Sequence, residues 1–154
     1  ARELGITKIA TGHSLDDEAE AVILNLMKGN PALLAKLGPV SGIKQRKKLV
    51  QRIKPLYLCS SKEVILYAKF QKLPLSLESC TLRTDTFLAG IRDFLENMEK
   101  KHPEIKNAIV NSLLQILPLL KEKRKDIELT SCKKCKEASS DELCKRCKIL
   151  GMLK

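Results

Sequence analysis

Four cysteines near the end of the sequence restrict the fold of that segment more than any other feature does. They form two Cys-x-x-Cys pairs, Cys132 with Cys135 and Cys144 with Cys147, and eight residues separate the pairs. Each pair suits a tight knuckle that directs two thiolates toward one tetrahedral zinc ion. Because cysteine would fill all four positions, the predicted site is structural. The segment is too short to bury much core, so metal binding would supply its folding free energy.

Disulfides, unliganded thiols and an iron–sulfur cluster are the alternative interpretations of these cysteines. The chain has six cysteines, enough for three disulfides, but nothing in the sequence suggests export, so a metal site in a reducing compartment is favoured. Six basic residues lie among the four ligands, and they either offset the thiolate charge or contact phosphate. These residues are Lys133, Lys134, Lys136, Lys145, Arg146 and Lys148.

The charge balance gives the first indication of a partner. Lys and Arg number 29 against 18 Asp and Glu, which gives a net charge of +11. Such an excess attracts polyanions, and nucleic acid is the usual one, although a basic soluble protein without that function is the alternative. Aromatic residues make up only 3% of the chain, which favours contacts with the backbone of a folded RNA over base stacking.

Neither an apolar run long enough to span a membrane nor a secretion leader is present in the sequence, so a cytoplasmic protein without membrane contact is predicted. The chain opens with Ala-Arg-Glu-Leu-Gly and lacks an initiator Met. That opening is typical of a helix end with its glycine stop, so we expect the chain to be the C-terminal portion of a longer protein.

Hydrophobic patterning predicts an α/β fold. A buried strand over residues 6–11, a turn at Gly12 and His13, and a helix with a capping box of Ser14 and Asp17 form the unit of a parallel sheet. The elements predicted after it are a loop at 31–48 with a basic run near Lys47, a strand at 49–54, a helix at 60–72, a helix from 84 or 85, a helix ending at Pro118 and a charged hinge at 121–126.

The turn after the first strand combines a glycine with several carboxylates. Gly12 would let a ligand approach the backbone closely, and the helix N-terminus offers N–H groups to an anion. The carboxylates could instead hold Mg²⁺ against the phosphates of a nucleotide. The alternative is purely structural, because acidic residues in a first turn are stabilised by the helix dipole, and His13 would then be an ordinary turn residue.

Three segments together resemble the PP-loop ATPases that modify tRNA. Residues 10–20 read Ala-Thr-Gly-His-Ser-Leu-Asp-Asp-Glu-Ala-Glu, and the family's second signature is approximately A-T-G-H-N-L-D-D-E-A. Residues 50–56, Val-Gln-Arg-Ile-Lys-Pro-Leu, and residues 78–80, Glu-Ser-Cys, look like the next segments in the same order. With its four-cysteine tail the chain is similar to the tRNA-uridine 2-thiolation branch, which has terminal zinc modules.

The resemblance implies an architecture in three parts. Residues 1–83 would be the C-terminal half of a doubly wound, adenine nucleotide alpha hydrolase-like domain, and residues 84–127 a helical extension. Residues 128–154 would be a small zinc ribbon. The family's phosphate-binding S-G-G-x-D-S loop is absent from this sequence, so these residues alone would be inactive.

The resemblance also implies a reaction, in which ATP adenylates the uridine C2 oxygen and sulfur then replaces AMP. Gly12 and His13 would border ATP, and Asp17, with Asp16 beside it, would be catalytic. Cys80 would take part in sulfur transfer or bind a [4Fe–4S] cluster, whose other ligands this chain lacks. From composition alone, Cys80 would be a small buried hydrophobe.

The partners implied are tRNA and a sulfur donor, for example a ubiquitin-like sulfur carrier, and a homodimer is expected. Two alternatives stay open. One is a different PP-loop modification, such as cytidine 2-thiolation. The other is a non-catalytic zinc-ribbon protein that binds tRNA and has no use for Gly12 and Asp17.

Overall fold

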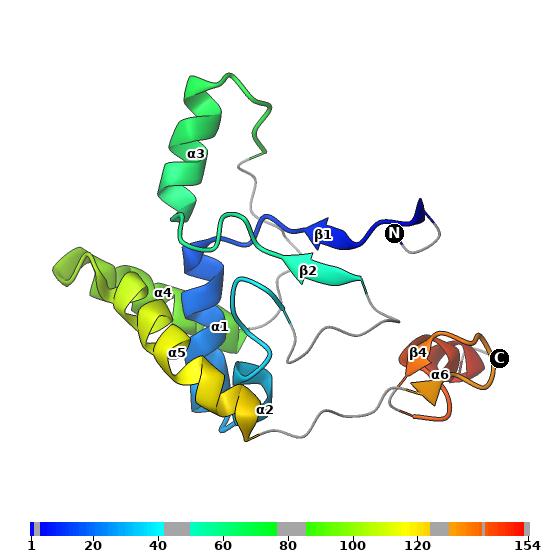
Figure 1. The fold of residues 1–154 in the computed structure, drawn as a ribbon. Helices are drawn as coiled ribbons and strands as arrows, with labels where there is room; N and C mark the ends of the chain where they lie inside the picture. The colour runs from blue at the N-terminus through cyan, green and yellow to red at the C-terminus, as the bar shows by residue number, and fades with distance from the viewer. Residues whose placement is uncertain (2–3, 42–49, 77–85, 124–129, 140, 153–154) are drawn as a thin grey trace.

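The computed structural model describes residues 1, 4–41, 50–76, 86–123, 130–139 and 141–152. It is a mixed α/β structure, shown in Figure 1. The elements are β1 (Lys8–Ala10), α1 (Leu15–Met27), α2 (Pro31–Leu34), β2 (Gln51–Ile53), α3 (Ser61–Phe70), α4 (Thr86–Lys101), α5 (Ile105–Glu122), β3 (Thr130–Ser131), β4 (Ala138–Ser139) and α6 (Lys145–Met152).

The strands β1 and β2 pair in parallel, with Ile9 opposite Arg52. A parallel pair across an intervening helix confirms the α/β unit predicted from the sequence. The prediction of a buried strand is wrong, since all three residues of β1 are exposed and Ile9 keeps 43% of its accessible surface. Within the described residues β1 pairs only with β2, so the further strands of a doubly wound sheet are not seen.

Helix α1 begins at the capping box that the sequence predicts, and α3 begins at a second one. The Ser14 side chain accepts a hydrogen bond from the Asp17 N–H, and the Asp17 carboxylate accepts one from the Ser14 N–H. Ser60 and Glu63 repeat the arrangement at α3. These motifs satisfy backbone donors that would otherwise lack partners, which is why a four-residue pattern locates a helix start so well.

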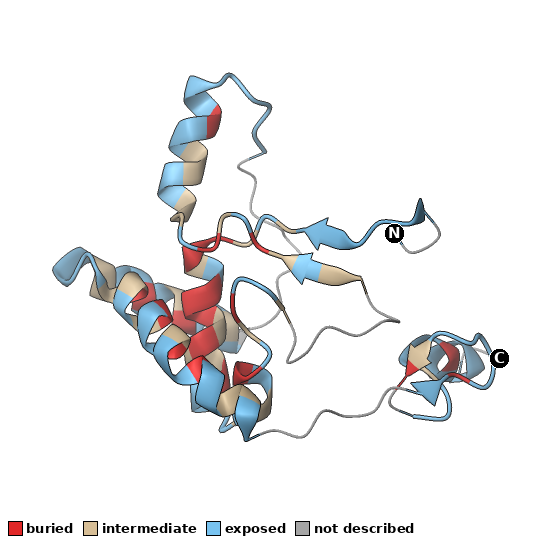
Figure 2. Ribbon diagram, viewed as in Figure 1, coloured by how far each residue is buried: buried red, intermediate tan, exposed pale blue. Residues whose placement is uncertain are grey.

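The core lies where α1 packs against α4 and α5, and Figure 2 shows it as the run of buried positions along these helices. One buried cluster consists of Leu15, Ala19, Tyr57, Ile91, Leu95 and Val110. The other consists of Val22, Leu34, Leu113 and Leu117. The helix α3 is mostly exposed and projects away from these helices in Figure 1.

The last long helix extends beyond its predicted end. The sequence places the end of α5 at Pro118, but the helix continues to Glu122 with Pro118 inside it. Proline in a helix interior costs about 3 kcal/mol. Leu117 is buried and Leu120 packs against the same cluster, so burial on both sides of Pro118 offsets that cost. The predicted hinge therefore cannot begin at residue 121.

The segment predicted as a loop contains a short helix, α2, whose first residue is Pro31 and whose N-cap is Asn30. Gly38 follows it with φ of +113°, and a Cβ there would lie 2.9 Å from a methyl carbon of Leu117. The absence of a side chain at Gly38 therefore lets the turn after α2 approach α5 closely. Among the described residues, no helix is both long and apolar enough to cross a membrane.

Candidate functional site

The four cysteines of the C-terminal module converge on one point. Cys132 directly follows β3, and Cys135 lies in the turn between β3 and β4. Cys144 precedes α6, and Cys147 lies in its first turn. All four Sγ atoms lie within 4.8 Å of one another. The first pair lies in the turn between two strands, whereas the second pair lies at the start of α6.

Backbone donors stabilise the negative charge of this cluster. The Cys144 N–H points at the Cys132 Sγ at 3.3 Å, and the Cys147 N–H at the Cys144 Sγ at 3.5 Å. Backbone hydrogen bonds from Cys135 and Cys144 lower the pKa of Cys132 to about 6. Burial and the neighbouring thiols raise the pKa of Cys147 to about 12. Cys132 therefore loses its proton far more readily than Cys147 does.

The sulfur spacing fits a single tetrahedral ion. A zinc ion with Zn–S bonds of about 2.3 Å keeps its sulfur ligands about 3.8 Å apart, which agrees with the 4.8 Å limit and with the 3.5 Å between Cys135 and Cys144. A four-iron cluster spreads its thiolates around a larger cage.

Five of the six cysteines lie in the described part of the chain, and all five are free, so none of them forms a disulfide.

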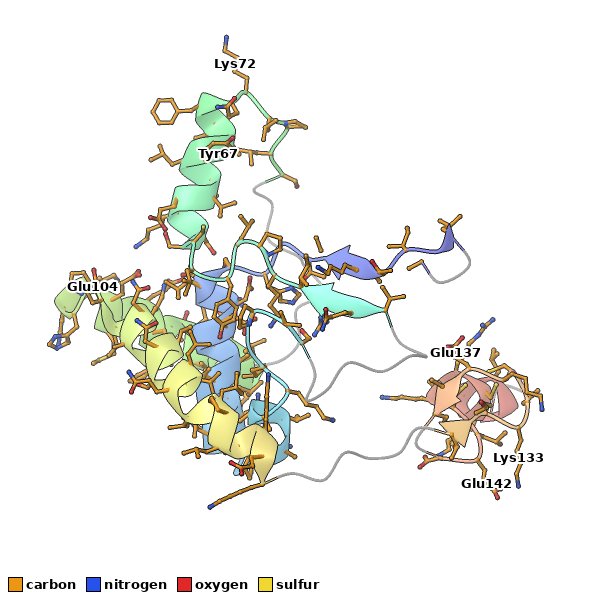
Figure 3. All side chains as sticks on the ribbon, viewed as in Figure 1. Tyr67, Lys72, Glu104, Lys133, Glu137 and Glu142 are labelled. Carbon is orange, nitrogen blue, oxygen red and sulfur yellow. The ribbon has the colours of Figure 1, made fainter. Side chains whose placement is uncertain are left out.

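Two of the six basic residues around the cluster form ion pairs. Lys133 pairs with Glu142 at 2.6 Å, and Figure 3 shows both side chains on the same side of the module. Lys148 pairs with Asp141. The other four are exposed and form no ion pair within the described ranges; they are Lys134, Lys136, Lys145 and Arg146.

The glycine turn lies at the C-terminal end of β1, as predicted. A Cβ on Gly12 would have no atom within 4 Å, so the space above this backbone is open to a ligand. The His13 Nδ1 lies 3.0 Å from the Thr11 hydroxyl, and that contact orients the ring. The Thr11 N–H donates to the Ile53 carbonyl, which ties the turn to β2.

The two aspartates of the turn have different surroundings. Asp17 is exposed, and its Oδ2 accepts hydrogen bonds from the Ser14 N–H at 2.8 Å and the Ser14 hydroxyl at 3.0 Å. Asp16 is half-buried. Its Oδ1 accepts a hydrogen bond from the Lys106 ammonium at 2.5 Å, and its Oδ2 one from the Ser61 N–H at 2.7 Å. Both Asp16 oxygens are therefore engaged by other helices.

The pKa values of Asp16 and Lys106 are shifted by these contacts. Burial alone would raise the pKa of Asp16, but hydrogen bonds from Lys106 and the Ser61 backbone hold it below its ordinary value. Burial alone would lower the pKa of Lys106, but its bonds to Asp16 and Glu99 raise it. Glu99 also binds Lys62 at 2.8 Å, so the turn belongs to a network across α1, α3, α4 and α5.

Two further ion pairs lie behind the turn, and sequence reasoning missed both. Glu18 and Lys54 form a pair in which each side chain is at most 3% exposed. Glu20 accepts two hydrogen bonds of 2.7 Å from Arg92 on α4. The sequence pattern predicts only that Glu18 is an acidic residue in the first turn of a helix. The only signal was that Lys54 falls in the Arg-Ile-Lys-Pro segment that resembles the PP-loop family.

The expectations for Cys80 and for the basic run near Lys47 lie outside the described residues. Cys59 is half-buried, and its carbonyl accepts a hydrogen bond from the Leu15 N–H at 2.8 Å. The contact joins the first residue of α1 to the segment before α3.

Comparisons with known proteins give consistent names. No family model matches the chain. It is 34% identical, over all of its length, to a tRNA-5-methyluridine(54) 2-sulfurtransferase of Pyrococcus horikoshii, and 34% identical over 99% of its length to cytoplasmic tRNA 2-thiolation protein 1 of Mus musculus. The chain spans 49% of the Pyrococcus protein and 36% of the mouse protein.

A solved structure agrees with these relatives. The U34-tRNA thiolase NcsA from Methanococcus maripaludis, solved with its [4Fe–4S] cluster, superposes with a TM-score of 0.77 at 33% sequence identity. The match covers 99% of this chain and 47% of that protein.

Proposed function

This chain is homologous over nearly its whole length to the tRNA 2-thiolation proteins, and on that premise we propose that it is the C-terminal part of an ATP-dependent tRNA-uridine 2-thiolase. The one observation that supports this most is the extent of the structural match, which covers 99% of the chain at a TM-score of 0.77.

The proposed architecture follows from the same match. Residues 1–83 complete a doubly wound sheet whose other strands come from the rest of the protein. This accounts for the exposure of β1, where an apolar residue such as Ile9 faces solvent in this chain alone. Residues 84–127 form the helical extension, and residues 128–154 the metal module. We propose that these residues alone do not thiolate tRNA.

The proposed reaction has two steps. The uridine C2 oxygen attacks the α-phosphorus of ATP, so an O–P bond forms and pyrophosphate leaves. A sulfur nucleophile then adds to C2, and the C–O bond breaks as AMP departs with the oxygen. Activation is needed because the carbonyl oxygen by itself is a poor leaving group. The sulfur donor is a separate partner, and a ubiquitin-like sulfur carrier is the class that we propose.

The glycine turn supplies the nucleotide side of this reaction. In this proposal Gly12 borders ATP, and the open space around its backbone is compatible with that role. His13 lies next to it, with its Nδ1 3.0 Å from the Thr11 hydroxyl. Asp17 is the catalytic carboxylate we favour, since it is exposed at the N-terminus of α1, where it can meet Mg²⁺ or the substrate. Asp16 contributes from a position in which both oxygens are already engaged.

Two metal groups belong to the proposal. Zinc fits the compact cluster of Cys132, Cys135, Cys144 and Cys147, where it would stabilise the module. A [4Fe–4S] cluster, as in the Methanococcus thiolase, would be held by Cys80 together with cysteines outside this chain, and it would supply or accept sulfur.

The tRNA is the proposed substrate, and the exposed cations of the module, such as Lys134 and Arg146, would contact its phosphates. The protein would act in the cytoplasm, as the name of the mouse relative indicates, and as a homodimer.

Nucleoside mass spectrometry of tRNA tests the function. Cells that lack the gene should lose one 2-thiouridine derivative, and the full-length gene should restore it. A variant with Asp17→Ala should bind tRNA normally and fail to restore the nucleoside. Loss of a thiolated cytidine instead would identify another PP-loop modification. Persistence of every thiolated nucleoside in the deletion strain would favour a non-catalytic tRNA-binding protein.

A further inference from the structure

We infer that Lys106 is a positioning residue of the nucleotide site: from α5 it holds Asp16 and so fixes the glycine turn against the helical extension. The inference rests on the proposed function, because it takes the turn to border ATP. Nothing in the sequence patterns or in the names of the relatives assigns a role to this lysine.

Burial restricts where Lys106 can lie. The Lys106 side chain is 6% exposed, although lysine is rarely buried unless it is paired. Its ammonium lies 2.5 Å from the Asp16 Oδ1 and 3.3 Å from the Glu99 Oε2. Withdrawing an ammonium from water is costly, and two carboxylates compensate for it only at close range. The arrangement therefore restricts Lys106 to a narrow set of positions.

Asp16, the partner of Lys106, lies within the turn itself. It is the second residue of α1 and the immediate neighbour of Asp17. Its other oxygen accepts the Ser61 N–H, so α3 holds the same carboxylate from a second direction. With Lys106 and Ser61 in place, the start of α1 cannot rotate or shift along its axis without breaking a hydrogen bond.

The residues proposed to border ATP lie next to the cap that this network holds in place. The Ser14 hydroxyl lies 3.0 Å from the Ser61 hydroxyl and caps α1 together with Asp17. Gly12 and His13 precede this cap directly. Small displacements of a site from its productive geometry reduce rates strongly, so a residue that fixes the turn affects ATP use without touching ATP.

The test uses the full-length protein and three single substitutions. Lys106→Met removes the contact with Asp16, and Lys106→Arg keeps a cation that can reach it. Lys62→Met is the matched control, because Lys62 makes the same kind of bond to Glu99 in the same network but is 80% exposed and does not touch Asp16. ATP affinity is measured by calorimetry, tRNA affinity by filter binding, and thiolation by kcat and KM for ATP.

We expect Lys106→Met to weaken ATP binding or kcat/KM for ATP by roughly tenfold or more, with tRNA affinity within about twofold of wild type. Lys106→Arg should recover most of the loss, and Lys62→Met should stay close to wild type. A purely structural role would instead lower the amount of folded protein and leave the ATP parameters of the folded fraction unchanged, and that result would overturn the inference.

A double variant covers the case in which Lys106→Met does not fold. Asp16→Asn with Lys106→Met leaves no unpaired buried charge, and it should fold yet bind ATP weakly. Wild-type ATP affinity in the double variant would overturn the inference. If the wild-type protein binds ATP but thiolates no tRNA, the proposed function fails while the ATP affinities still decide the role of Lys106. A wild-type protein that does not bind ATP would contradict both.

Discussion

At the scale of single residues, the pair of Glu18 and Lys54 makes the strongest prediction about stability. Both side chains are almost fully buried, and Tyr57 lies beside them with its pKa raised to about 12 by burial and by the charge of Glu18. Lys54→Met would leave a buried carboxylate without its partner, which costs about 3–5 kcal/mol. We expect urea denaturation of this variant to show a loss of that size.

A double variant separates the pair from its surroundings. Glu18→Gln with Lys54→Met removes both charges, so it should cost less than the sum of the two single substitutions. Additive losses in the denaturation midpoints would contradict a direct interaction between the two side chains.

The network around Asp16 predicts how stability depends on pH. The pKa values of Asp16 and Glu99 lie below their ordinary values, so their contribution to the free energy of unfolding is complete above about pH 4.5 and falls as the solution becomes more acidic. The pKa of Lys106 lies above its ordinary 10.5, so its contribution is complete below that pH and is lost above it.

Comparison of wild type with Asp16→Asn checks this dependence, because any effect of acid on the cysteine cluster is common to both proteins and cancels in the difference. The difference between their free energies of unfolding should be largest between about pH 5 and pH 10 and should shrink toward pH 3. An equal difference at pH 7 and pH 3 would show that the charge of Asp16 is not involved.

Which of these contacts can be predicted from the sequence depends on how far apart the two residues lie along the chain. Ser14 and Asp17 are three positions apart, so helix geometry fixes their contact and the pattern predicts it. Asp16 and Lys106 are 90 positions apart, and only the packing of α1 against α5 brings them together. The sequence therefore indicated the turn but not the residue that holds it. The role of Asp17 in catalysis stays a prediction.

At the scale of elements, Gly38 and Gly29 form a contrasting pair for testing how α2 docks on α5. A Cβ would meet Leu117 at Gly38 and open space at Gly29. Gly29 has φ of +57°, which alanine can adopt at a cost of about 1 kcal/mol, whereas Gly38 has φ of +113°, outside the left-handed region of other residues. Gly38→Ala therefore strains the backbone more and also forces Leu117 to move, so we expect thermal denaturation to show a clearly larger loss than for Gly29→Ala. Equal losses would mean that both the turn and Leu117 adapt freely.

The elements also show where local rules fail. The starts of α1 and α3 were predicted correctly because caps are local. The end of α5 was wrong because burial of Leu117 and Leu120 overrides the tendency of Pro118 to end a helix. The short α2 was missed because four residues give too little periodicity to recognise, although Asn30 and Pro31 are typical of a helix start.

At the scale of the whole molecule, the metal module and the helical core should respond differently to loss of metal. The module has two very short strands, one short helix and few buried residues besides Cys132 and Cys147, so we expect its folding to depend on a bound ion. The core of α1, α4 and α5 has two apolar clusters of its own. We expect Cys135→Ser to abolish one equivalent of zinc in elemental analysis and to expose residues 130–152 to protease.

The same variant should leave the helical core protected, and Cys59→Ser, which changes a cysteine outside the cluster, should keep both zinc and protection. Loss of zinc from Cys59→Ser would contradict the assignment of the four ligands. The cluster was predictable because metal-ligand spacing is local. The complete sheet was not, because β1 and β2 alone do not determine which strands lie beyond them.

The hydrogen bond between Asp16 and Lys106 has a consequence for the stage of folding at which the glycine turn becomes fixed. Contacts between residues so distant in sequence close late in folding, after helices and caps have formed. A nascent or truncated chain that ends before α5 would carry the whole glycine turn as a capped helix start, yet without the restraint that fixes it. If the proposed function holds, ATP recognition would arise in the same cooperative step as helix docking, and unfinished chains would be silent toward the nucleotide rather than partly active.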